Sequence, residues 1–130
     1  MADAVSPVGA MGLCQFMPGT WAGIIGPAKL PSDASAFVPR LSIEAAGFYM
    51  GKLRAEWSSP RPEWDRHSLA LASYNAGLGH LLTAQRKCNG AVLYDSIVSC
   101  LPAVTGRHST ETVGYVASIW GWFDRMKKGW

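Results

Sequence analysis

The sequence predicts a small, mostly helical fold, and two observations carry this prediction. Apolar residues recur at helical spacing in residues 42–57 and again in residues 113–123. No segment has the clear alternation of a strand, and residues 91–99 suit a helix and an extended segment equally well. At 130 residues, of which 48% are hydrophobic, the chain is long enough for one compact domain over residues 1–130.

The N-terminal third begins with an uncharged, glycine-rich stretch over residues 6–21. Within it, Pro18-Gly19 predicts a turn that ends a helix over residues 12–17. Thr20 is then the expected cap of a short helix that runs through Trp21 to Ile25. Three prolines between residues 26 and 40 predict a surface loop.

The middle of the chain predicts three more helices. The first runs from Ser42 to about residue 57 and buries an apolar face made of Ile43, Ala46, Gly47, Met50, Leu53 and Trp57. A proline-rich connection over residues 58–64 leads to Asp65, the expected N-cap of a helix over residues 66–76. Gly77 ends that helix, and a short helix over residues 79–86 follows.

The last predicted helix begins at Ser109 or Thr110 as its cap and ends at Lys127-Lys128. Its spacing predicts a buried stripe of Val113, Val116, Ala117, Trp120 and Phe123. Trp21, Trp57 and Trp120 are the tryptophans expected in the core.

Charge and composition exclude several functions. The net charge is +3, and Lys127-Lys128 is the one local basic run, which is too little for a nucleic-acid surface. Prolines interrupt the uncharged residues 4–28, so no membrane span is expected there. Asp3 stands where a signal peptide would carry basic residues, so no signal peptide is expected. No cysteine and histidine spacing indicates a metal site, and no cofactor is expected.

Three cysteines leave one without a partner. Cys88 and Cys100 bracket a short segment, and they suit either a disulfide that closes this loop in an oxidising compartment or two reduced, buried thiols. Cys14 is expected to pack as a small apolar residue.

Three motifs occur in order along the chain. Residues 6–20 read SPVGAMGLCQFMPGT, residues 71–77 read LASYNAG, and Glu111-Thr112 is followed by Tyr115-Val116. Together they resemble the signatures of the lytic transglycosylases, in the soluble, SLT-type branch with a goose-type lysozyme-like fold. Cys14 replaces the methionine that is usual in the first of these motifs.

This resemblance implies a lysozyme-like helical domain that acts on the MurNAc-GlcNAc glycan strands of peptidoglycan. It implies a lyase reaction in which one glutamate serves first as acid and then as base, leaving 1,6-anhydro ends. Trp64 and Trp130, at the edges of elements, are further candidates for stacking on sugars. The residues that match the family's substrate-binding positions are Ser6, Gln15, Met17, Tyr74, Asn75 and Glu111.

The family's catalytic glutamate has no counterpart in the sequence. Counted back from Ser6, it falls upstream of Met1, so the domain is expected to be truncated at its N-terminus and catalytically impaired. Glu111 is the remaining candidate, although it matches a glutamate that contacts substrate rather than the acid. Asp3 lies nearest in sequence to the missing position.

Three classes of function therefore compete. The first is an enzyme whose first helix comes from another segment or is absent through a misplaced start. The second is a wall-binding module without turnover, and the third is a lysozyme-fold module reused to bind or inhibit a protein. The expected partners are a glycan strand, and a protein or second copy that covers the surface left by the missing helix. We expect synthesis in the cytoplasm and action in the periplasm or cell wall, with delivery by a phage as one route.

Overall fold

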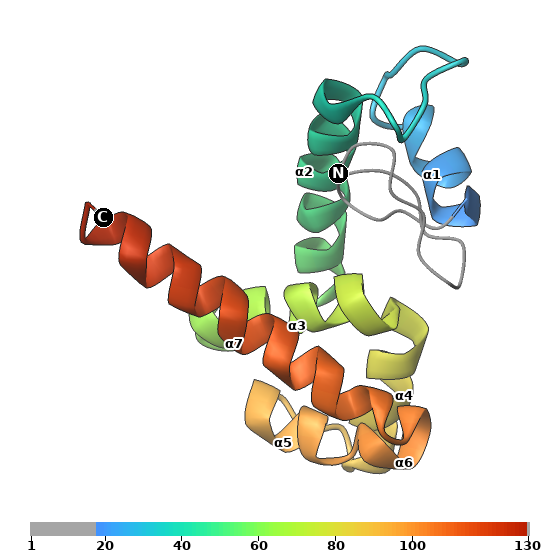
Figure 1. Ribbon diagram of the computed structural model, residues 1–130. Coiled ribbons are helices and arrows are strands. Elements are labelled where there is room, and N and C mark those ends of the chain that lie inside the picture. Colours follow the sequence, from blue (N-terminus) through green and yellow to red (C-terminus); the bar gives the residue numbers. More distant parts are fainter. Residues whose placement is uncertain (1–17, 130) are drawn as a thin grey trace. The chain divides into compact units, whose positions relative to one another are not determined.

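The computed structural model describes residues 18–129, and in this range the fold consists of seven helices and no strand (Figure 1). The chain divides into two compact units, Met1–Lys52 and Leu53–Trp130, which are described separately. The single domain over residues 1–130 stays a prediction. The helices are α1 (Pro18–Ile25), α2 (Pro39–Glu56), α3 (Glu63–Ala76), α4 (Leu78–Lys87), α5 (Tyr94–Ser99), α6 (Pro102–Thr105) and α7 (His108–Lys127).

In the first unit, Pro18 and Gly19 lie within α1, so the predicted turn at Pro18-Gly19 is wrong. The indole of Trp21 is buried and donates from Nε1 to the carbonyl oxygen of Ala34 at 3.0 Å. This bond ties the predicted loop to α1 and confirms Trp21 as a core residue.

Helix α2 begins at Pro39, three residues before the predicted start, and buries a different face. Ile43 is 57% exposed, whereas Leu41 and Ala45 are buried. Because each residue turns a helix by about 100°, Ile43 lies about 200° from each of these two neighbours. The predicted stripe is therefore wrong at its start, but Leu53 and Trp57 at the other end are buried as expected.

The core of the second unit is the antiparallel pair of α3 and α7, which are yellow-green and red in Figure 1. Every residue from Ser68 to Ser73 is buried. Two indole N–H groups are paired in this core: Trp57 Nε1 donates to Ser73 Oγ at 2.9 Å, and Trp120 Nε1 donates to Ser68 Oγ at 2.9 Å. The two serines therefore allow large indole rings to pack without leaving an N–H unsatisfied.

Asp65 is not the N-cap of α3, because that helix already begins at Glu63. Its carboxylate instead accepts a hydrogen bond from the backbone N–H of Tyr94 at 2.9 Å, at the start of α5. Residues 94–99 are helical, which decides between the two interpretations of this segment. The short α6 that follows was not predicted.

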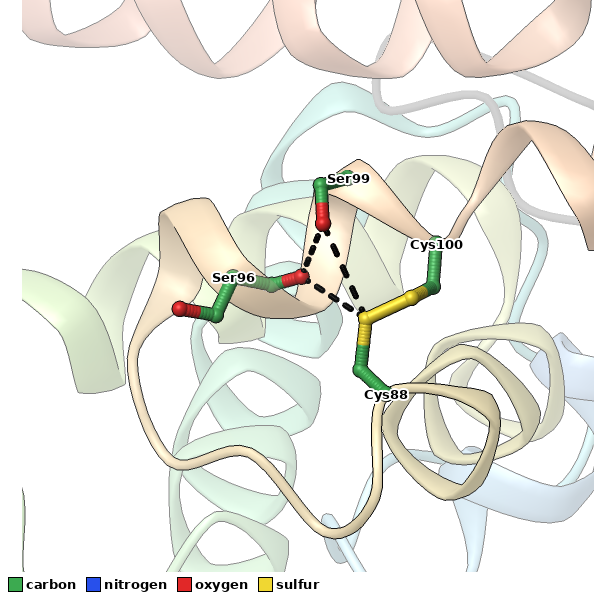
Figure 2. The surroundings of a disulfide bond; sticks show 4 residues. All are labelled: Cys88, Ser96, Ser99 and Cys100. Carbon is green, nitrogen blue, oxygen red and sulfur yellow. Dashed lines mark hydrogen bonds between the residues drawn. A yellow bond between two sulfur atoms is a disulfide. The ribbon is translucent and has the colours of Figure 1, made fainter.

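Cys88 and Cys100 form a disulfide, so the oxidised alternative is the one found (Figure 2). The bridge joins the end of α4 to the end of α5. The hydroxyl of Ser99 donates to the carbonyl oxygen of Ser96 at 2.6 Å, and the Cys88 sulfur lies 3.0 Å from the same oxygen.

Helix α7 begins at His108, so neither Ser109 nor Thr110 caps it. The Ser109 hydroxyl donates to the carbonyl oxygen of Gly106 at 2.8 Å. Of the predicted buried stripe, Val116 is buried and Trp120 is partly buried, whereas Val113, Ala117 and Phe123 are exposed. None of the helices between residues 18 and 129 is long and apolar enough to cross a membrane.

Candidate functional site

The predicted site residues divide into two groups. Ser6, Gln15 and Met17 lie outside the described residues. Tyr74 and Asn75 lie in the last turn of α3, and Glu111 lies in the first turn of α7.

A direct hydrogen bond joins the second motif to the third. The Thr112 hydroxyl donates to Asn75 Oδ1 at 2.7 Å and lies 3.3 Å from the carbonyl oxygen of His108. Thr112 is fully buried and Asn75 is half-buried, and the bond between them orients the Asn75 amide. Since Asn75 Oδ1 accepts this bond, its NH₂ group retains donor capacity. The two motifs therefore meet where α3 ends and α7 begins.

Glu111, the neighbour of Thr112, has an open carboxylate. Its side chain is 65% exposed, and its Oε2 lies 2.7 Å from His108 Nε2, one turn earlier in α7. A general acid for glycoside cleavage normally sits in a poorly hydrated pocket that keeps its carboxyl protonated. Glu111 lies in no such pocket, and its exposed oxygens are suited instead to accept hydrogen bonds from hydroxyl groups.

Gly77 sets the end of α3 beside these residues. Its φ is +100°, a conformation that L side chains rarely adopt, and its N–H donates to the carbonyl oxygen of Ser73 at 2.9 Å. The chain therefore turns directly after Asn75 and Ala76, and α4 begins at Leu78. Gly77, the last residue of LASYNAG, thus ends α3 and keeps the motif in the last turn of that helix.

An aromatic pocket of about 370 Å³ lies at the opposite end of the α3–α7 pair. Trp64 and Trp120 stack there with ring centres 6.0 Å apart, and Phe123 meets Trp120 edge-on at 5.6 Å. We call this the aromatic pocket; it is lined by Arg54, Glu63, Trp64, His67, Ile119, Trp120 and Phe123.

The charged rim of the aromatic pocket is held together by Arg54. Its guanidinium donates to Glu63, and its NH1 lies 3.2 Å from Nδ1 of His67. Hydrogen bonds from Arg54 and Arg66 lower the pKa of Glu63, so this carboxylate stays ionised. Burial, with a smaller contribution from the charge of Arg54, lowers the pKa of His67. The rim therefore holds an ionised carboxylate and a neutral imidazole at neutral pH, and neither group is prepared to donate a proton.

The aromatic pocket was not predicted from the sequence. The sequence predicts Trp120 in the core, yet it forms a wall of the pocket; Trp64, the other stacked ring, is predicted only as a residue at an element edge that could stack on sugars. The available signal was the helical spacing of Trp64 and His67 on α3 and of Trp120 and Phe123 on α7. Across residues 18–129, no three His, Cys, Asp or Glu side chains are grouped to hold a metal ion.

The described residues form a small, mostly helical fold in which two of the motifs meet at Asn75 and Thr112. The family model for the transglycosylase SLT domain matches residues 1–92, and the chain belongs to this family. Its function is accordingly of the peptidoglycan lytic transglycosylase type. Glu111 and Thr112 lie beyond the matched residues, so the bond to Asn75 links the matched segment to the rest of the chain. No curated protein and no solved structure matches the chain.

Proposed function

We propose that this domain binds MurNAc-GlcNAc glycan strands of peptidoglycan where α3 ends and α7 begins, using Tyr74, Asn75 and Glu111. The observation that carries the proposal is the hydrogen bond from Thr112 to Asn75, which brings the second and third motifs together. The amide of Asn75 donates to sugar oxygens, and the open carboxylate of Glu111 accepts from sugar hydroxyls. Ser6, Gln15 and Met17 are proposed to complete the site on the family pattern.

We further propose that no described carboxyl group serves as the catalytic acid. Glu63 is held ionised by two arginines, and Glu111 is open to water beside His108. A proton donor for the glycosidic oxygen normally sits in a poorly hydrated pocket. With the described carboxyl groups alone, we expect the chain to bind glycan strands and to release no 1,6-anhydro products.

The disulfide supports action outside the reducing cytoplasm. Disulfides persist in oxidising compartments such as the periplasm and the cell surface, and Cys88 is bonded to Cys100. We therefore propose that the domain works in the periplasm or the cell wall.

Two measurements with the purified chain test the proposed function. The first is co-sedimentation with lipid-free, insoluble peptidoglycan, in which the unaltered chain is expected in the pellet. Glu111→Gln should weaken binding about tenfold or more, because a hydrogen bond to a charged group is lost. Glu56→Gln is the matched control, since it changes an exposed carboxylate on α2 outside the motifs. If both variants bound peptidoglycan equally well, Glu111 would not be part of the binding site.

The second measurement is digestion of peptidoglycan, with products identified by mass spectrometry. Intact glycan with retained binding supports a binding module. Anhydro products would overturn the non-catalytic part of the proposal, and Glu111→Gln and Asp3→Asn would then show which carboxylate acts. Absence of any peptidoglycan binding would overturn the proposal as a whole and favour the alternative, a module that binds or inhibits a protein.

A further inference from the structure

The second half of α7 presents large apolar side chains to solvent. Trp122 is 51% exposed, Phe123 49% and Met126 60%. With Ile119 they follow the i, i+3, i+4, i+7 pattern and so lie along one face of the helix. In Figure 1 the last turns of α7, in red, run on past α3. A continuous stripe of this kind on a helix end indicates an interaction surface rather than scattered surface residues.

Basic side chains lie directly beside this apolar stripe. The guanidinium of Arg125 lies 5.0 Å from the ring centre of Trp122, and the ammonium of Lys127 lies 5.9 Å from that of Phe123. Lys128 follows, and Asp124 is the single acidic residue among residues 119–128. Long basic side chains can rest on aromatic rings and still extend their charges toward an anionic surface.

We propose that residues 119–128 of α7 dock on an anionic phospholipid membrane. Trp122, Phe123 and Met126 enter the boundary between headgroups and acyl chains, and the three basic residues pair with lipid phosphates. Helices that lie in this boundary combine an aromatic or aliphatic face with neighbouring Lys and Arg. Anionic lipids attract each such cation near the surface.

A second copy of the chain is a poorer occupant of this face. Aromatic side chains bury about 150–250 Å² each when fully covered, so half-exposed ones offer roughly 100 Å² each. Two facing stripes would then bury well under the approximately 1,200 Å² of a stable protein interface. A symmetric contact would also bring the basic residues of both copies together, and like charges at an interface oppose association.

Co-sedimentation of the full chain with vesicles tests this proposal. Vesicles of phosphatidylglycerol and phosphatidylethanolamine should bind the chain, and vesicles of phosphatidylcholine should bind it much more weakly. Lys127→Gln and Lys128→Gln should each weaken binding about fivefold, because each removes one attracted cation. A Trp122→Ser/Phe123→Ser double variant should weaken it at least tenfold. Raised salt should weaken binding of the unaltered chain by screening.

Two matched control variants distinguish binding through the proposed face from non-specific binding to vesicles. Val113→Ser changes an exposed apolar residue in the first half of α7, and Lys87→Gln changes an exposed lysine at the end of α4. Both should bind vesicles like the unaltered chain. Because all the substituted side chains are exposed, circular dichroism should show every variant folded.

Three results would overturn the proposal: no binding to anionic vesicles, equal binding to both vesicle types, or loss of binding in the controls. A dimer in light scattering that the Trp122→Ser/Phe123→Ser variant dissociates would instead assign the face to a second copy. Since glycan binding is measured on lipid-free peptidoglycan, failure of this proposal and failure of the proposed function are read separately.

Discussion

Thr112 donates its hydroxyl proton to the side-chain oxygen of Asn75 at 2.7 Å, although 37 residues separate the two in the sequence. The contact links the last turn of α3 to the first turn of α7. It therefore couples the stability of the core pair to the geometry of the proposed glycan site.

Thr112→Val should show this coupling. The substitution keeps the shape of the side chain but leaves Asn75 Oδ1 without its donor, and an unsatisfied part-buried acceptor costs about 1–3 kcal/mol. Urea denaturation should show this loss, together with weaker peptidoglycan binding. Thr110→Val, at an exposed position, should change neither. If Thr112→Val retained full stability, the bond would contribute little in solution.

Tyr94→Phe should stabilise the protein. The Tyr94 hydroxyl is buried and has no hydrogen-bond partner among the described residues. Burial, with a smaller contribution from Asp95, raises its pKa to about 12. Removing an unpaired buried hydroxyl should add about 1 kcal/mol to the free energy of unfolding. A urea midpoint lower than that of the unaltered chain would mean that the hydroxyl has a partner in solution.

Stability should fall as the solution is acidified from about pH 7.5 to about pH 5.5, in part because of His67. Its pKa is lowered in the folded state by burial and by Arg54. As the pH falls below about 6.5, His67 therefore binds a proton in the unfolded chain but not yet in the folded chain, and this favours unfolding. This loss of stability is complete once the pH lies below the pKa of His67 in the folded chain.

The contribution of His67 is isolated by substitution. His67→Gln should flatten the dependence of the urea midpoint on pH, whereas His80→Gln, at an exposed histidine on α4, should leave it in place. If the urea midpoint of His67→Gln changed with pH as steeply as that of the unaltered chain, burial of His67 would not be the source of the pH dependence.

Reduction of the disulfide should destabilise the second unit. The two cysteines are 12 residues apart, and releasing a loop of this size costs about 3 kcal/mol in the chain-entropy model. The urea midpoint of the unaltered chain should fall when dithiothreitol is added. A Cys88→Ala/Cys100→Ala double variant should start at the lower value and show no response to the reductant.

The helical fold was predictable because its signals are local. Apolar spacing and Gly77 locate α3 within a few residues of its true bounds. The start of α2 was missed because Pro39 indicates a loop, whereas proline also suits a first helical position, and the turn expected at Pro18-Gly19 is helical. Asp65 was misassigned as a cap because its true partner, the Tyr94 N–H, lies 29 residues away.

The candidate site was predictable only in part. The motifs predict Asn75 and Glu111 as site residues, and this stays a prediction. Thr112 is part of the third motif, but its hydrogen bond to Asn75 depends on how α3 and α7 pack. Exposure along α7 was not predictable either. The same helical spacing runs through buried Val116 and exposed Phe123, and packing alone decides which half of the helix is covered.

The bridge between Cys88 and Cys100 also determines what a proteolytic cut in this region would do. The turn at Asn89 and Gly90 is exposed and takes positive φ values, so it is open to a protease. A single cut there would leave two fragments still joined through sulfur, because the turn lies inside the closed loop. The nicked protein would migrate as one species on a non-reducing gel and separate only after reduction.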